Sequence, residues 1–359
     1  MQIVVGLVLD RFGARRFVLL GSFACAVGVL TFAATDSIWI GGAGRLLTGF
    51  GASFAFIASL WLINHWFAPE RFALLSGAVN AIGMVGAAIG AIVLSEAIAS
   101  VGWRTVFLVT GAVGLMLFAT ALAFLHEPAS PAETADSGPV EYARESLRTV
   151  VGDGRIWAIS VIGLLYYMPV NIYAGLWGTT ELIRDHQLTP VAAQFGVSMI
   201  FWGMAIGSIV GGWLSDLLGH RKFLVFFGAI LTGLAYAAVL YLPGSQLSDS
   251  ILLFAAGFFG GLQMLTFAMA KEGHDSGLVG TIAAFVNMIG IAGALVFQPL
   301  VGYLADLTGG DFQLALTSVP VCSAIAALIA LFVPEYRHRY HTAGARSGAE
   351  VLPEATNVQ

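Results

Sequence analysis

Apolar residues in this chain occur in long runs that charged or turn-forming residues separate. Ten runs approach or exceed the roughly 20 residues that a membrane-spanning helix needs. They cover residues 17–35, 38–64, 73–98, 103–125, 155–179, 190–217, 222–242, 248–270, 277–305 and 313–334. An earlier apolar run, Met1 to Leu9, ends at Asp10 and is too short to span. The pattern predicts an all-α polytopic membrane protein with about ten full transmembrane helices and one partial helix.

Composition supports this prediction and excludes other classes. The chain is 58% hydrophobic and 10% charged, whereas soluble domains carry roughly 25% charge. Such a chain is neither soluble nor disordered. With 16 Lys and Arg against 21 Asp and Glu, nucleic acid is not an expected partner. Runs of this length also disfavour a β-barrel, whose strands alternate apolar and polar residues.

The basic residues predict an orientation in the membrane. Thirteen Lys and Arg residues fall in alternate loops and the C-terminal tail, whereas only Arg104 and Arg184 lie on the other side. Because basic loops stay in the cytoplasm, we expect a multi-pass protein of the cell membrane with its C-terminus inside. The polar segment 126–154 reads as a cytoplasmic linker between an N-terminal bundle, 1–125, and a C-terminal bundle, 155–335, followed by a cytoplasmic tail, 336–359.

One sequence motif occurs twice, 206 residues apart and without gaps. The first copy is Gly6-Leu-Val-Leu-Asp10-Arg11-Phe-Gly13-Ala-Arg15-Arg16, and the second is Gly212-Trp-Leu-Ser-Asp216-Leu-Leu-Gly219-His-Arg221-Lys222. The first glycine lets a neighbouring helix pack closely, and the second allows a tight turn. The aspartate can attract a helix N-terminus, and the basic pair can bind lipid phosphates or carboxylates. Matched positions in two halves indicate a parallel internal repeat.

The repeated motif resembles the loop signature of the major facilitator superfamily, found between helices 2 and 3 and between helices 8 and 9. This resemblance implies two pseudo-symmetric bundles that move a solute by alternating access. It also places the first run in helix 2, so that helix 1 and half of helix 2 are missing from this sequence. We therefore expect that Met1 is internal to a native chain with about 40 to 60 further residues.

Site residues follow from the same resemblance, since helices 4, 7 and 10 line the cavity in this family. Arg45, within Gly44-Arg45-Leu-Leu-Thr48-Gly49-Phe-Gly51, lies about 10 Å inside its span. Such a buried charge faces protein or water, either in a solute or coupling contact or in a bond to backbone carbonyls. The other candidates, which could equally be packing or interfacial residues, are Tyr166, Tyr167, Asn171, Tyr173, Trp177 and Gln263.

A gate is predicted at the cytoplasmic side. The first motif copy, through Asp10, Arg11 and Arg15, faces the loop residues Glu70 and Arg71 on the same side of the membrane. Opposite charges there would hold this side closed in one state.

The sequence predicts a secondary transporter without cofactor, metal or catalytic site. All seven histidines lie at span ends, in loops or in the tail, so no haem-like pair or catalytic triad lies inside the membrane. Arg45 favours an anionic or zwitterionic solute. Proton symport is possible, with Glu96 and Glu181 as the nearest acids. We expect a monomer in the bilayer. The alternative is a non-transporting receptor or scaffold of the same fold, or an inactive fragment.

Overall fold

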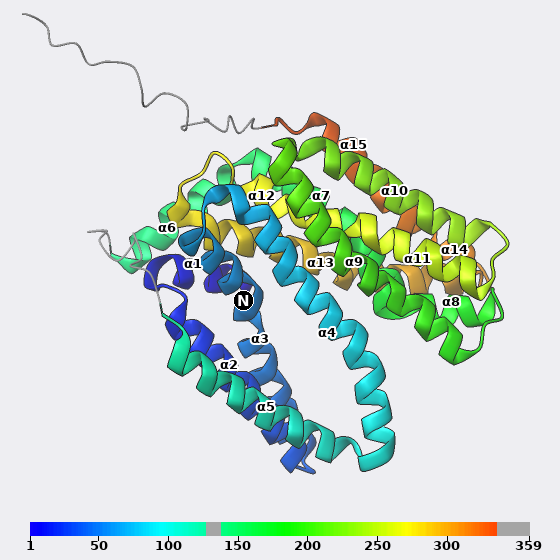
Figure 1. The fold of residues 1–359 in the computed structure, drawn as a ribbon, viewed down its shortest axis with the longest axis horizontal. Helices are drawn as coiled ribbons and strands as arrows, with labels where there is room; N and C mark the ends of the chain where they lie inside the picture. The colour runs from blue at the N-terminus through cyan, green and yellow to red at the C-terminus, as the bar shows by residue number, and fades with distance from the viewer. Residues whose placement is uncertain (127–137, 336–359) are drawn as a thin grey trace, which may run out of the picture.

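The computed structural model describes residues 1–126 and 138–335, and these residues contain helices but no strand (Figure 1). The N-terminal half contains α1 (Gln2–Phe12), α2 (Arg15–Ala34), α3 (Ile38–Trp66), η1 (Pro69–Arg71), α4 (Phe72–Val101) and α5 (Trp103–Phe124). The C-terminal half contains α7 (Gly154–Pro169), η3 (Val170–Trp177), α8 (Gly178–Arg184), α9 (Pro190–Leu218), α10 (Lys222–Tyr241), α11 (Gln246–Gly260), η4 (Gly261–Met264), α12 (Leu265–Lys271), η5 (Ser276–Leu278), α13 (Val279–Leu307), α14 (Phe312–Leu316) and α15 (Ser318–Phe332). The predicted tail, 336–359, and linker residues 127–137 lie outside the described residues.

Ten helical segments are long and apolar enough to cross a membrane, which confirms the predicted number of full spans among the described residues. Their bounds differ from the predicted ones by a few residues at most ends. The exception is the first span of the C-terminal half, which runs from Gly154 to Arg184 and contains a π-helical segment, η3. Pro169, which lacks a backbone N–H, lies directly before this segment and favours the departure from α-helix.

Small residues set the close packing in the N-terminal half. Gly21 of α2 meets Gly51 of α3, and a Cβ on Gly51 would lie 2.2 Å from the Gly21 carbonyl oxygen. Further along the same two helices, Gly28 lies against Gly44, and a Cβ on Gly44 would lie 2.7 Å from the Gly28 carbonyl oxygen. The glycines around Arg45 therefore serve helix packing, since only a residue without a side chain permits such an approach.

The two halves meet along two helix pairs, α1 with α13 and α4 with α9. In Figure 1, α4 and α9 lie close at the upper part of the view and diverge toward its lower right. The space around the glycines of α4 increases along this divergence. A Cβ on Gly77 would lie 2.1 Å from the Ser208 carbonyl oxygen, whereas one on Gly83 or Gly86 would meet nothing within 4 Å. The halves are thus in tight contact at one end and separated at the other.

The predicted linker contains a helix, α6 (Pro139–Gly152), among its described residues. Pro139 occupies the first position of this helix, where its missing N–H is not needed. The hydroxyl of Tyr142 donates to the carbonyl of Gly277, 3.0 Å away, so α6 is attached to η5, the short helix before α13. Burial, and to a smaller extent the nearby Asp10 carboxylate, raises the pKa of Tyr142 to about 12.

Candidate functional site

A central cavity of about 220 Å³ lies between the two halves. The N-terminal half contributes residues of α3 and α4, and the C-terminal half contributes residues of α7, η4, α12 and α13. The side chains that carry its chemistry are Phe56, Asn80, Met84, Tyr167, Gln263, Phe267 and Asn287. A cavity at the interface between two repeats is where alternating exposure to the two sides can occur.

The cavity walls combine amides with aromatic rings, and no charged residue is among those that line it. Asn80 is 9% exposed, and its side-chain nitrogen has no hydrogen-bond partner among the described residues. An unsatisfied buried amide costs free energy, which a bound group can recover. Amides both donate and accept hydrogen bonds, so this wall suits hydroxyl and carboxylate groups of a small solute.

Two of the predicted site residues, Tyr167 and Gln263, line this cavity. Arg45 does not. It is exposed in a different pocket, of about 390 Å³, where its guanidinium lies 5.5 Å from the centre of the Phe32 ring. Phe56, the α3 residue in the central cavity, is 11 positions further along the helix, or about 16 Å. Arg45 is thus not among the residues that line the central cavity in this conformation, and its contact with a solute stays a prediction.

Tyr166 and Tyr173 are instead packed inside the C-terminal half. Tyr166 is 1% exposed, and its hydroxyl donates to the carbonyl of Phe259 at 2.5 Å. Tyr173 is fully buried, and its hydroxyl donates to Oε2 of Glu181 at 2.6 Å. Tyr166 belongs to α7 and Tyr173 to η3, and contact of either residue with a solute stays a prediction.

Asn171 and Trp177 connect η3 to α13. The side-chain amide of Gln298 donates to the Asn171 carbonyl at 2.8 Å, and the Trp177 indole donates to the Gln298 carbonyl at 3.2 Å. These contacts position the helix segment beyond the cavity and do not reach into it.

The end of the molecule that carries Arg15, Arg71, Arg155, Arg221 and Lys271 is called the basic end below. Here the first motif copy joins α1 to the first turn of α13. Asp10 is 2% exposed and accepts hydrogen bonds from the backbone N–H groups of Gly280 and Thr281, at 2.8 and 2.6 Å, and from the Thr281 hydroxyl at 2.7 Å. A carboxylate at a helix N-terminus is favourable because the free N–H groups there carry partial positive charge.

The glycines of the first copy make this contact possible. A Cβ on Gly6 would lie 2.5 Å from the Gly280 carbonyl oxygen, so α1 approaches α13 closely only because Gly6 has no side chain. Gly13 has φ of 81°, a conformation that favours glycine, at the turn into α2. Arg15 donates to the carbonyl of Leu125 at 2.7 Å, and Arg11 lies over the Tyr142 ring. Arg16 is exposed.

The second copy makes the equivalent contact from the C-terminal half to the N-terminal half. Asp216 at the end of α9 accepts a hydrogen bond from the backbone N–H of Leu74, in the first turn of α4, at 2.9 Å. A Cβ on Gly212 would lie 2.5 Å from the Ala73 carbonyl oxygen. Gly219, with φ of 65°, ends the helix. Each half therefore places one aspartate at a helix N-terminus of the other half.

A buried charge network supports the second copy. Arg221, 5% exposed, donates to Glu272 at 2.6 Å and lies 3.4 Å from Asp216. Arg155 joins the same Glu272 carboxylate. Burial raises the pKa of Glu272, although Arg221 and then Arg155 act in the opposite direction. The side chain of Lys222 donates to the carbonyl of Leu331 at 2.5 Å.

The predicted partners Glu70 and Arg71 lie in η1, where both are exposed. Their contact with the first motif copy stays a prediction. Sequence reasoning missed Gly280 and Thr281, because the first turn of α13 carries no signature of its own. It also missed Asn80, a single amide in an apolar run, for which only its polarity was a signal.

Comparisons with known proteins agree with this geometry. The sequence profile of the Major Facilitator Superfamily matches residues 1–180 and 159–356. A D-galactonate transporter of Escherichia coli O6:H1 is 24% identical, with 91% of this chain and 81% of the relative aligned. The membrane sensor protein UhpC of Salmonella typhimurium is 28% identical, with 82% and 71% aligned. The fucose:proton symporter FucP of E. coli has a similar fold, with a TM-score of 0.73 at 15% identity, over 93% of this chain and 87% of that one. None of these three is an enzyme.

Proposed function

Since this chain belongs to the Major Facilitator Superfamily, we propose that it carries a small, polyhydroxylated organic acid across the cell membrane by alternating access. The basic end lies in the cytoplasm, as the distribution of Lys and Arg favours. The protein acts as a monomer, because the solute path lies within one chain, between its two halves.

The paired aspartates at the basic end are the observation that carries this proposal. Asp10 and Asp216 each bind a helix N-terminus of the other half, and the halves separate toward the opposite end. This arrangement is the one expected of a transporter closed to the cytoplasm and open to the outside. Breaking both contacts would let the basic end open, as alternating access requires.

The central cavity and the relatives support the class of solute. Amide and tyrosine side chains match the hydroxyl groups of a sugar acid, and the aromatic rings can cover the apolar faces of its carbon chain. The D-galactonate transporter is a relative that moves such an acid. Arg45, exposed on the open side of the N-terminal half, favours the approach of an anion.

Uptake into proteoliposomes tests the proposal. We expect radiolabelled D-galactonate to enter at a rate well above that of protein-free liposomes, and L-fucose, a neutral sugar, to enter more slowly. Asn80→Ala removes a hydrogen-bonding group from the cavity and should weaken apparent affinity about tenfold, the equivalent of about 1.4 kcal/mol. Ser59→Ala is the matched control, because the exposed Ser59 hydroxyl bonds only within its own helix. Equal effects of the two substitutions would contradict the assigned cavity.

A sensor is the second candidate, because UhpC, a relative, is a membrane sensor. A sensor would bind the solute without moving it. Binding of D-galactonate to the purified protein, measured by thermal shift, together with no uptake by the same preparation, would favour the sensor over the transporter.

A further inference from the structure

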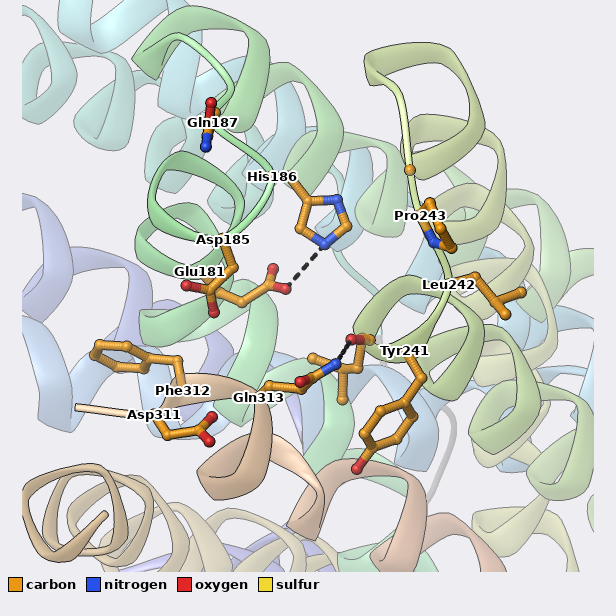
Figure 2. A pocket seen from close by; sticks show the side chains of 12 residues that line it. Glu181, Asp185, His186, Gln187, Tyr241, Leu242, Pro243, Asp311, Phe312 and Gln313 are labelled. Atoms are coloured by element: carbon orange, nitrogen blue, oxygen red, sulfur yellow. Dashed lines mark hydrogen bonds and ion pairs between the residues drawn. The ribbon is translucent and has the colours of Figure 1, made fainter. Parts of the chain in front are cut away.

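A second pocket, of about 600 Å³, opens in the C-terminal half at the end opposite the basic end; it is called the distal pocket below (Figure 2). Its walls come from α8 and the loop that follows it, from the end of α10 and the loop after it, and from α14. The polar residues that line it are Glu181, Asp185, His186, Gln187, Tyr241, Asp311 and Gln313. The central cavity does not share any of these residues.

His186 lies between two buried carboxylates at this pocket. Its Nε2 is 3.2 Å from Oε1 of Glu181, the contact drawn in Figure 2, and its Nδ1 is 2.8 Å from Oδ2 of Asp249. The side chains of both acids are 1% exposed, and that of His186 is 9% exposed. Glu181 belongs to α8 and Asp249 to α11, so the imidazole joins two helices.

Each of these two contacts needs a proton between the ring nitrogen and the carboxylate oxygen. A neutral imidazole has one N–H donor, and its other nitrogen has only a lone pair, which repels a carboxylate oxygen. Both contacts are attractive when the ring carries two N–H groups, that is, as an imidazolium between two carboxylates. The cluster therefore holds one proton more than a neutral histidine with two ionised acids.

The surroundings favour retention of this proton. The second oxygen of Glu181 accepts from the Tyr173 hydroxyl, and Oδ1 of Asp249 has no hydrogen-bond partner among the described residues. Negative charge dominates the neighbourhood: Asp185 and Asp311 line the same pocket, whereas Arg184 lies over the Phe312 ring. From α10, the titratable neighbours are Tyr236 and Tyr241. The helix that packs on α8, α9, has no charged residue before Asp216.

We propose that Glu181, His186 and Asp249 form a proton-binding site, loaded from the distal pocket, which ties α8 to α11 while it is occupied. When the proton leaves His186 for water in the pocket, a bare ring nitrogen faces a carboxylate. The longer contact, to Glu181, then opens and releases α8.

The site is connected to the central cavity through η3. Tyr173, which donates to Glu181, lies in η3, and Trp177 at the end of this segment donates to Gln298 of α13. Tyr167 and Asn287, on α7 and α13, line the cavity. A released α8 can thus move the outer part of this span over the cavity. This role in the transport cycle rests on the proposed function, whereas proton binding does not.

Nitrogen-15 NMR of the histidine rings tests proton binding without any solute. In the full chain in nanodiscs at about pH 7.5, we expect His186, identified by loss of its signals in His186→Gln, to be doubly protonated. The exposed His126, outside the distal pocket, serves as the internal reference. In Glu181→Gln the amide nitrogen can donate to the ring while the amide oxygen still accepts from Tyr173, so His186 should become neutral. A neutral His186 in the wild type, or no change in Glu181→Gln, would overturn the proposal.

Spin-label distances test the tie between the helices. Labels at Ile183 of α8 and Leu247 of α11, both exposed, are placed after Cys25→Ala and Cys322→Ala. In the wild type the distribution should be narrow at a pH where the nitrogen-15 spectra show a doubly protonated His186 and broader at a higher pH where they show a neutral ring, and in Glu181→Gln it should stay narrow at both pH values. Glu96→Gln, the same substitution at an exposed acid of α4 in the other half, should behave as the wild type. Identical wild-type distributions at the two pH values would overturn the tie. If both measurements succeed and no uptake is seen, only the proposed function fails.

Discussion

The Asp10→Asn substitution tests the closure of the basic end. Asp10 is buried and holds the first turn of α13 with three hydrogen bonds, two of them from backbone N–H groups. Asparagine has nearly the same shape but carries no charge, and one of its two acceptor atoms becomes an NH₂ group. That NH₂ faces a donor, so at least one of the three bonds is lost. We expect α1 to separate from α13 more readily in the variant.

The size of the effect follows from these contacts. A hydrogen bond to a charged group contributes about 1.5–3 kcal/mol, and a charge at a helix N-terminus contributes about 0.3–1 kcal/mol. The asparagine oxygen recovers part of this, which leaves a net loss of about 2 kcal/mol. The equilibrium between the closed and the open basic end should therefore shift about 30-fold toward the open form.

Spin labels at Phe67 of the N-terminal half and Phe223 of the C-terminal half report this equilibrium, because both positions are exposed at the basic end. We expect one dominant distance in the wild type and a second, longer one in Asp10→Asn. Asp216→Asn is the matched comparison, and its effect should be smaller, because Asp216 holds one backbone N–H of α4. An unchanged distribution in a folded Asp10→Asn protein would refute the reasoning.

Three further predictions concern helix packing, Arg45 and pH. Gly77→Ala should lower thermal stability by about 1–3 kcal/mol, since its Cβ would lie 2.1 Å from the Ser208 carbonyl oxygen, while Gly86→Ala, where the space is open, should be neutral in a melting experiment. Arg45→Lys should impair D-galactonate uptake far more than folding, because an ammonium cannot make the planar contacts of a guanidinium, and wild-type uptake would contradict this. Asp153→Ala removes the cap of α7 and should cost about 1 kcal/mol at neutral pH. Burial acts to raise the pKa of Asp153, but hydrogen bonds outweigh it and lower the pKa below 3.8. The higher melting temperature of the wild type relative to Asp153→Ala should therefore persist above about pH 5, and the difference should shrink as the pH falls below 3.8.

The sequence by itself determined the spans and the repeat. A helix in lipid satisfies all its backbone hydrogen bonds internally, so whether a segment spans depends mainly on its own length and apolarity. That locality is why ten spans could be predicted within a few residues. The repeated motif was equally visible, because its glycines and aspartates recur at fixed spacing in each half.

Only the tertiary structure decided which residues meet. Asp10 and Gly280 are 270 positions apart, and no local pattern pairs them. The sequence did not distinguish the candidate tyrosines, but the structure places Tyr167 at the central cavity and directs the Tyr173 hydroxyl to Glu181 inside the C-terminal half. Glu181, His186 and Asp249 come together only because His186, in the loop after α8, reaches the first turn of α11. The positions of helices relative to one another depend on close contacts between distant small residues, and these contacts are not a local property of the sequence.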